Sequence, residues 1–474
     1  MVEELNEPLS TMRSGTELTR KPVTKMTSET KLYRRYAEHP LKEALADSPA
    51  VLIHGPRQCG KTTLARMVNS SLTIVWPGGT VIKWPGVGVI EWPAATNYIT
   101  FDDETAREAA ERDPIGFVND LPARVILDEV QRAPSIFTAL KMAIDRDRIP
   151  GRFLLTGSSQ VLLVPRVSDS LAGRLEIIRL HPLAQCELSG QHPTFLERLF
   201  SGDLKAPELA GASDRLADRI VAGGFPAALA RSSEGRRRNW YLNYVETQLQ
   251  RDIRDIAKIS DHGAMIRLLT VAATQTARLY NLQDMSSTFR LSRPTIGKYV
   301  EILERIFLLE RIPAWQNNRL KRMVKAPKLH VCDTGIGCAV IGASSEALKK
   351  DRDLYGQYLE SFVFQELKRQ ASWSDDTLTF YHYRDKDKVE VDLVIEKGAM
   401  AVAGVEVKAS STVRASDFHG LRKLKDAVGD RFAGGVVLYD GEKCWSFGEG
   451  LTAAPVSLLW ENPAETASNL QLDG

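Results

Sequence analysis

The sequence has few cysteines, and none of them is placed to build a disulfide framework or a zinc site. The five cysteines are scattered, with no Cys-x-x-Cys pair and no histidine at zinc spacing. No segment approaches eighteen uninterrupted apolar residues, which excludes a membrane-spanning helix, and residues 1–30 lack the apolar stretch of a signal peptide. We therefore expect a reduced, cytoplasmic protein with no membrane partner and a flexible N-terminal tail over residues 1–30.

An excess of charge of one sign is also missing. The formal net charge is +2 over 474 residues, so no global field attracts this protein to nucleic acid, and any basic surface has to be local. The length is too great for one ordinary core and predicts several domains. Hydrophobic residues at 43% and charged residues at 26% are typical of a globular protein rather than a disordered or fibrous one.

Short apolar runs alternate with helical patterns in the first part of the chain. The runs cover residues 51–54, 98–101, 124–127, 153–156 and 175–180. This alternation predicts a parallel, doubly wound α/β sheet, which we assign to a domain of residues 31–198.

A Trp-Pro pair recurs every eight residues, at Trp76, Trp84 and Trp92, and interrupts this pattern. Because proline disfavours a central strand and the neighbouring glycines supply turns, we expect an inserted flap over residues 74–95. The flap either packs or forms a subunit contact, or its tryptophans stack on unpaired bases.

A phosphate-binding loop follows the first apolar run. The segment from Gly55 to Thr62 matches G-x-x-x-x-G-K-[ST], lies after a strand and opens a helix. In such a loop backbone N–H groups surround the phosphates, Lys61 reaches the terminal phosphates and Thr62 binds magnesium. The predicted ATP-binding residues are Gly55, Pro56, Arg57, Gln58, Cys59, Gly60, Lys61, Thr62 and Thr63.

Two carboxylates end a later apolar run, about seventy residues after the loop. Asp128 is expected to orient the magnesium shell, and Glu129 to polarise the attacking water. Thr156 and Ser158 end the next run, where their hydroxyls either lie near the γ-phosphate or cap a helix. The cofactors predicted from these residues are ATP and Mg²⁺.

An arginine precedes the fifth apolar run. Arg174 is our candidate arginine finger, because in a ring this position points into the neighbouring subunit's site. Arg166 is the second choice, and an ordinary surface arginine is the alternative.

Together these motifs resemble the AAA-plus superfamily, and more narrowly the prokaryotic AAA ATPases with a nuclease-like C-terminal domain of uncharacterised function. The resemblance rests on the two nucleotide motifs and on Leu155-Thr-Gly-Ser, Ser170-Leu-Ala-Gly-Arg, Gly223-Gly-Phe-Pro and Gly404-Val-Glu-Val-Lys. It implies an ATP-driven homo-oligomeric ring or partial ring, of which a hexamer is the expected form, with a helical lid over residues 199–260. The Trp-Pro flap departs from the family pattern.

Residues 261–335 have the outline of a winged helix. Ser292 and Pro294 are suited to start a helix, a shorter helical pattern precedes it, and a basic stretch follows. Such a domain contacts DNA phosphates through its cations; the alternative is a packing module with a solvated charged loop. The candidate DNA-binding residues are Arg293, Lys298, Arg319, Lys321, Arg322 and Lys325.

Residues 336–474 resemble the PD-(D/E)xK nucleases. Asp392, Glu406 and Lys408 occupy the D…ExK positions, and the resemblance calls for a further carboxylate from Glu360 or Glu366. It implies metal binding by Glu360, Asp392 and Glu406, with Asp392, Glu406 and Lys408 as catalytic residues of magnesium- or manganese-dependent DNA cleavage. The alternative is a solvated salt-bridge cluster.

The predicted architecture is therefore an α/β AAA-plus P-loop ATPase domain with a helical lid, a winged-helix domain and a C-terminal nuclease-like α/β domain. The function we expect is an ATP-driven machine that acts on branched or broken DNA as a translocase or branch migrator, and whose C-terminal domain either cuts DNA or only binds it. The competing function is a nucleotide switch in signalling or defence, whose ATPase cycle gates partner binding.

Overall fold

The computed structural model describes residues 32–69, 98–158, 161, 171–204, 215–256, 262–317, 322 and 325–461. The Trp-Pro flap and the N-terminal tail therefore lie outside the described residues. The second-choice finger Arg166 and two of the candidate DNA-binding residues, Arg319 and Lys321, lie outside them as well.

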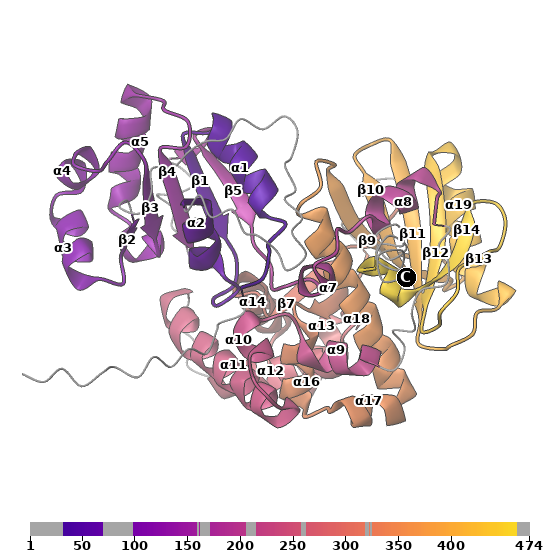
Figure 1. Ribbon diagram of the computed structural model, residues 1–474. Helices are drawn as coiled ribbons and strands as arrows, with labels where there is room; N and C mark the ends of the chain where they lie inside the picture. The colour runs from indigo at the N-terminus through magenta and orange to yellow at the C-terminus, as the bar shows by residue number, and fades with distance from the viewer. Residues whose placement is uncertain are drawn as a thin grey trace, which may run out of the picture. The chain divides into compact units, whose positions relative to one another are not determined.

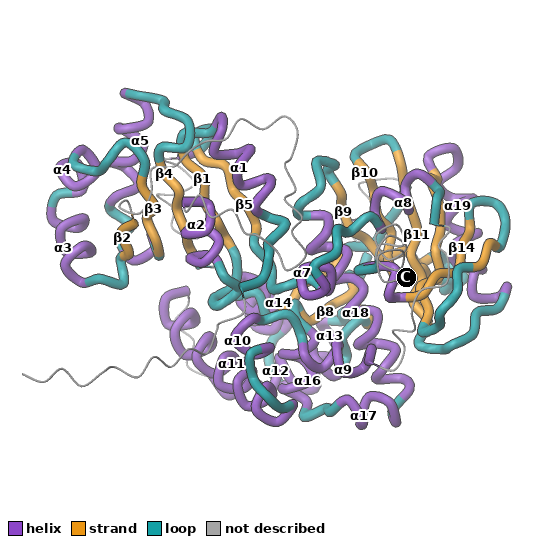
Figure 2. Tube along the Cα trace, viewed as in Figure 1, coloured by secondary structure: helices purple, strands orange, loops and turns teal. Residues whose placement is uncertain are grey.

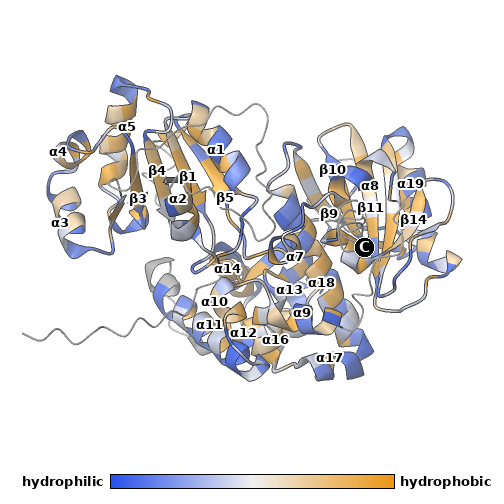
Figure 3. Cartoon of the chain, viewed as in Figure 1, coloured by the Kyte–Doolittle hydropathy of each residue, from blue (hydrophilic) through white to orange (hydrophobic). Residues whose placement is uncertain are grey.

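The first domain is built on a five-stranded parallel sheet with strand order β2-β3-β4-β1-β5 (Figure 1). Strands β1, β3 and β4 are buried along their whole length, and Figure 3 shows hydrophobic residues along them. The parallel sheet that the sequence predicts is thus confirmed. The strands are β1 (Ala50–His54), β2 (Tyr98–Thr100), β3 (Val125–Asp128), β4 (Phe153–Gly157) and β5 (Leu175–Arg179).

Helices cover both faces of this sheet because successive strand residues point to opposite sides. Val51 and Ile53 face the core formed with helices α1 and α2, whereas Ala50 and Leu52 face the core that contains helix α5. The helices are α1 (Glu38–Asp47), α2 (Lys61–Asn69), α3 (Glu104–Arg112), α4 (Pro114–Asn119) and α5 (Ile136–Arg146), with the short 3₁₀ helix η1 (Val130–Arg132).

The middle of the chain is mostly helical and includes a three-stranded antiparallel sheet of order β6-β8-β7. The start that the sequence predicts for helix α14 is confirmed. The Ser292 side chain accepts a hydrogen bond from the Thr295 backbone N–H, and Pro294 lies in the first turn. The elements are α9 (Leu216–Ala222), α10 (Pro226–Leu229), α11 (Glu234–Ile256), α12 (His262–Thr274), β6 (Arg278–Leu279), α13 (Leu282–Phe289), α14 (Arg293–Arg305), β7 (Leu309–Ile312), β8 (Lys328–Val331), α16 (Thr334–Ile341) and α17 (Ser345–Lys350).

The C-terminal part is a six-stranded mixed sheet of order β13-β14-β12-β11-β10-β9, which Figure 2 shows as a group of strands with helices beside it. Helix α18 packs on one face, through a core that includes Val405, and helix α19 packs on the other face against Val391 and Val437. The elements are α18 (Arg352–Ala371), β9 (Leu378–Arg384), β10 (Glu390–Lys397), β11 (Ala401–Lys408), α19 (His419–Val428), β12 (Phe432–Tyr439), β13 (Trp445–Ser446) and β14 (Leu451–Pro455).

A helix that lies well before the C-terminal part in the sequence belongs structurally to its sheet. Helix α7 (Gln185–Ser189) ends the first domain, and helix α8 (Phe195–Ser201) then packs on strands β11 and β12. Phe195 and Leu199 are fully buried in the same core as Val436 and Leu438. The segment near Leu199, where the sequence suggested the beginning of a lid, is therefore a covering helix of the C-terminal sheet.

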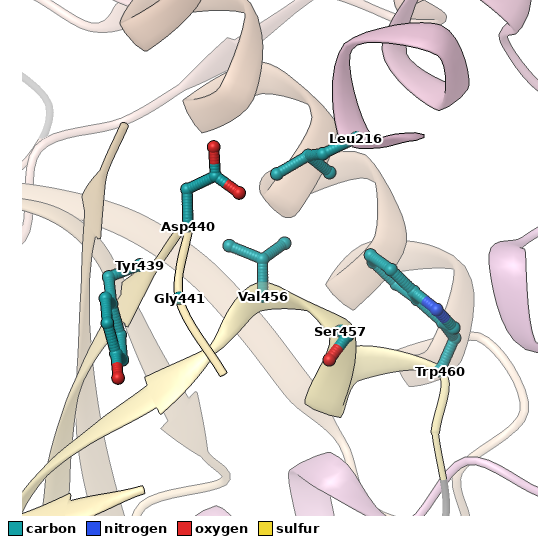
Figure 4. A pocket seen from close by; sticks show the side chains of 7 residues that line it. All are labelled: Leu216, Tyr439, Asp440, Gly441, Val456, Ser457 and Trp460. Atoms are coloured by element: carbon teal, nitrogen blue, oxygen red, sulfur yellow. The ribbon is translucent and has the colours of Figure 1, made fainter. Parts of the chain in front are cut away.

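A cavity near α9 and the C-terminal end of the sheet is too small to hold a ligand larger than water. Its volume is about 10 Å³, close to the minimum for one water molecule. Figure 4 shows its lining residues, which are Leu216, Tyr439, Asp440, Gly441, Val456, Ser457 and Trp460.

All five cysteines are free thiols. Among the helices that the structure describes, none combines the length and the apolar character that crossing a membrane requires.

Candidate functional site

The predicted phosphate loop connects β1 to α2 and has the backbone geometry that its glycines allow. Gln58 and Gly60 have positive φ angles of 60° and 103°, a region that favours glycine. Gly55 approaches the carbonyl oxygen of Leu180 so closely that a Cβ atom at this position would lie 2.0 Å from it. The loop therefore curves tightly at the N-terminus of α2, where the helix dipole favours an anion.

Lys61 lies inside this curve. Its side chain is buried, and its Nζ donates to the carbonyl oxygens of Gly55 at 3.2 Å and Pro56 at 2.9 Å. Burial, with Arg179 and Lys61 nearby, lowers the pKa of His54 to about 4, so its imidazole adds no further charge. The loop therefore holds one ammonium group where the sequence expects the terminal phosphates.

Arg35 supports the loop from a position that the sequence motif does not include. Its guanidinium donates to the carbonyl oxygen of Cys59 at 2.7 Å, to that of His181 at 2.6 Å and to Glu187 Oε1 at 2.9 Å. The Cys59 thiol is buried, and burial raises its pKa, so it packs as a neutral group. A buried ion pair thus fixes the outer side of the loop.

The two predicted magnesium ligands are neighbours. The Thr62 hydroxyl donates to Asp128 Oδ1 at 2.9 Å, and the Thr156 hydroxyl donates to the same oxygen. Tyr98, on the adjacent strand β2, donates to Asp128 Oδ2 at 2.7 Å. Hydroxyl and carboxylate oxygens are the donors that magnesium prefers, so Thr62 and Asp128 fit that ion.

Glu129 is held next to this group in a restrained conformation. Its φ is 57°, its backbone N–H donates to the Thr156 hydroxyl at 3.2 Å, and the Gln131 amide donates to its carboxylate. The side chain is partly exposed at the carboxyl end of β3. A carboxylate fixed beside the metal ligands is placed to accept a proton from water.

The two hydroxyl residues at and just after the end of strand β4, Thr156 and Ser158, have different surroundings. Thr156 connects Asp128 to Glu129 and so organises the acidic residues. The Ser158 hydroxyl is buried, with no hydrogen-bond partner among the described residues. A buried hydroxyl normally has a partner, and Ser158 is therefore suited to donate to a bound phosphate.

Arg174 pairs within its own chain at the sheet surface. Its Nε lies 2.5 Å from Asp145 Oδ1, and its Nη2 lies 3.0 Å from Asp145 Oδ2. Both side chains keep contact with solvent, and an ion pair exposed in this way is weak because water screens the two charges. The guanidinium is therefore easily released to another partner.

Four of the five candidate nuclease residues lie together, namely Glu360, Asp392, Glu406 and Lys408, and Lys328 lies among them. Lys408 Nζ is 2.8 Å from Glu406 Oε1. Lys328, on strand β8, is 2.7 Å from Glu360 Oε1 and 3.1 Å from Asp392 Oδ1. Neither the spacing of the motif nor its strand pattern points to Lys328.

The titration of this cluster follows from its burial. Burial, with Asp392 close by, raises the pKa of Glu406 to about 8 and that of Glu360 well above its ordinary value. Burial alone would lower the pKa of Lys328, but the charges of Glu360 and Asp392 raise it overall. The lysine therefore stays charged.

Glu366, the other candidate carboxylate, lies elsewhere. It accepts from the Gln185 backbone N–H at 2.7 Å and from Arg369 at 2.8 Å. Its role is to join α18 to α7, and it is not part of the cluster.

The candidate DNA-binding residues that the structure describes fall into two groups. Arg293 and Lys298 are exposed on α14, and Lys325 is exposed with its Nζ 3.2 Å from the Arg384 carbonyl oxygen. Arg322 is instead buried and makes two hydrogen bonds of 2.7 Å to Glu396. Arg322, which the sequence predicts to bind DNA, therefore has its guanidinium held by a buried carboxylate in this structure.

Comparison with known proteins supports the assignment of the first domain. A family described as an AAA domain matches residues 47–189. Two domains of unknown function, DUF8612 and DUF4143, match residues 213–347 and 355–459. Residues 47–189 therefore form a P-loop ATPase domain.

The full-length relatives carry no functional description. Uncharacterized proteins of Mycobacterium tuberculosis and Mycobacterium bovis are each 27% identical over 428 residues, which cover 90% of this chain and 84% of theirs. A Walker-type ATPase of Pyrococcus abyssi is 15% identical, with a TM-score of 0.37 and coverage of 65% of this chain and 96% of its own. A DNA polymerase III gamma subunit-related protein of Thermotoga maritima is 13% identical, with a TM-score of 0.22 and coverage of 57% and 97%.

Proposed function

We propose that this P-loop ATPase domain binds ATP with magnesium and hydrolyses it. The observation that carries the proposal is the convergence of Thr62, Asp128 and Glu129 beside the loop that encloses Lys61. Magnesium, when bound, neutralises charge on the terminal phosphates.

The chain's own groups then have separate tasks. The Lys61 ammonium leaves the loop carbonyls to bind the terminal phosphates, and Ser158 supplies a hydroxyl that has no partner among the described residues. Thr156 fixes Asp128 and the backbone of Glu129 together. Glu129 orients the attacking water and accepts its proton.

Replacing Lys61 with alanine tests this site directly. We expect the affinity for ATP to fall by roughly 30-fold to several thousand-fold, because losing one partner of a buried charge pair costs about 2–5 kcal/mol. Binding is measured by titration with a fluorescent ATP analogue. Lys42→Ala is the matched control, since Lys42 is an exposed lysine of the same domain; equal affinities of the two variants would exclude Lys61 from the site.

We further propose that DNA, branched or broken, is the partner on which the ATPase acts, as a translocase or branch migrator. The support is the order of elements α12, β6, α13, α14, β7 and β8, which is compatible with the winged helix expected from the sequence, together with exposed Arg293 and Lys298 on α14. The C-terminal domain then provides an additional DNA-binding surface. In this proposal the active form is a homo-oligomeric ring, such as a hexamer.

A double replacement, Arg293→Ala with Lys298→Ala, tests the DNA surface. We expect weaker binding to every sequence and a salt dependence whose log–log slope falls by about two, because each phosphate contact contributes close to one. The measurement is fluorescence anisotropy of labelled junction DNA over a salt series.

The matched control removes two exposed lysines elsewhere, Lys42 and Lys350, and so changes the net charge equally. Equal slopes for both double variants would place the DNA contact elsewhere. ATP hydrolysis unaffected by any DNA, with slow turnover, would favour the nucleotide switch over the DNA motor.

A further inference from the structure

The carboxylate cluster of the C-terminal domain draws its side chains from two sheets and a helix. Glu360 comes from α18, Asp392 from β10, and Glu406 with Lys408 from β11. Lys328 comes from β8, the central strand of the three-stranded sheet. The cluster is therefore also a contact between the middle of the chain and the C-terminal sheet.

Nitrogen donors already occupy most of the oxygens that a metal ion would need. Asp392 Oδ2 accepts from the Val407 amide at 2.9 Å, and Glu406 Oε2 accepts from the Asp392 amide at 3.4 Å. With the contacts of Lys328 and Lys408, five of the six carboxylate oxygens accept an N–H bond. The structure identifies no metal-binding group of three His, Cys, Asp or Glu among its described residues.

Lys328 takes the position that a cation would fill between two of these carboxylates. Its ammonium lies within 3.1 Å of both Glu360 and Asp392, and it is 3% exposed. A divalent ion bridging the same two oxygens would have to approach to about 2.0–2.1 Å, which the ammonium prevents. The donor set therefore does not fit magnesium while Lys328 is present.

We propose that Lys328 is the resident cation of this cluster, so that the C-terminal domain binds no divalent metal there and joins β8 to its sheet instead. The cluster then acts as an ionic joint and not as a nuclease centre. Contact with DNA by this domain, if present, is grip without cleavage. The inference is independent of ATP hydrolysis, because none of these residues belongs to the ATP site.

Manganese binding to the nucleotide-free protein tests the proposal. Free Mn²⁺ is measured by its paramagnetic resonance signal during titration of the wild type and of Asp392→Asn. We expect equal numbers of bound ions, since any metal at the ATP site is common to both. One more ion in the wild type than in Asp392→Asn would overturn the proposal.

A second variant, Lys328→Met, removes the cation from the cluster and should allow a metal ion to bind there. Lys328→Met removes the ammonium but retains a side chain of similar length, and we expect one additional bound Mn²⁺ per chain that Lys328→Met with Asp392→Asn lacks. Lys397→Met, which changes a half-exposed lysine of β10, is the control and should gain none.

A folded Lys328→Met protein without the extra ion would show that lysine and metal do not compete. If Lys328→Met does not fold, the comparison of wild type with Asp392→Asn decides alone. Asp392-dependent cleavage of labelled junction DNA by the wild type in Mg²⁺ or Mn²⁺ would overturn the proposal as well.

Discussion

Replacing Arg174 with alanine is expected to slow ATP hydrolysis by about 10³- to 10⁵-fold while ATP still binds. An arginine finger in trans supplies an effect of this size by stabilising charge in the transition state. The pair with Asp145 does not oppose such a role, because both side chains contact solvent and the pair is weak. The measurement is phosphate release at saturating ATP, with nucleotide binding followed separately.

Asp145→Ala is the matched control for this variant. It breaks the same ion pair but leaves the guanidinium in place, so we expect hydrolysis to stay within about twofold of the wild type. Equal losses of hydrolysis in Arg174→Ala and Asp145→Ala would show that Arg174 acts only through its surface ion pair. Mixing Arg174→Ala with Glu129→Gln subunits should restore activity at interfaces where an intact finger meets an intact base. Failure to restore it would argue against the ring.

Replacing Glu129 with glutamine is expected to lower hydrolysis by about 10²- to 10⁴-fold, the usual contribution of a general base. ATP should remain bound, because Lys61, Thr62 and Asp128 are unchanged. The measurement is single-turnover hydrolysis of radiolabelled ATP. Glu176→Gln makes the same chemical change on the exposed edge strand β5 and serves as the control. Turnover of Glu129→Gln at the wild-type rate would show that Glu129 is not the general base.

The nucleotide site could be predicted because its chemistry is local in sequence. The segments around Lys61 and Asp128 each combine an apolar strand with its functional residues, and the carboxyl ends of parallel strands meet at one edge of a sheet. Their position next to each other, with Thr62 bonded to Asp128, follows from that rule.

The supporting residues could not be predicted because tertiary packing alone brings them to the site. Tyr98 contacts Asp128 only because β2 pairs with β3, and Arg35 contacts the loop from before the motif begins. The sequence assigns Arg322 to a basic wing, and Lys328 lies in the same basic stretch of the sequence, yet each is paired with a carboxylate of the C-terminal sheet. Charge in the sequence does not reveal which cations are buried.

Helix α8 has a consequence for the order in which the protein is made. The helix ends at Ser201, but the strand β12 on which it packs begins at Phe432. The ribosome therefore completes α8 roughly 230 residues before its partner strand, about 10–45 s earlier at 5–20 residues per second. Until β11 and β12 are made, the apolar face of α8, with Phe195 and Leu199, has no sheet to cover. A nascent chain of this protein thus carries an exposed hydrophobic helix until strands β11 and β12 have been made, which is the kind of surface that chaperones bind.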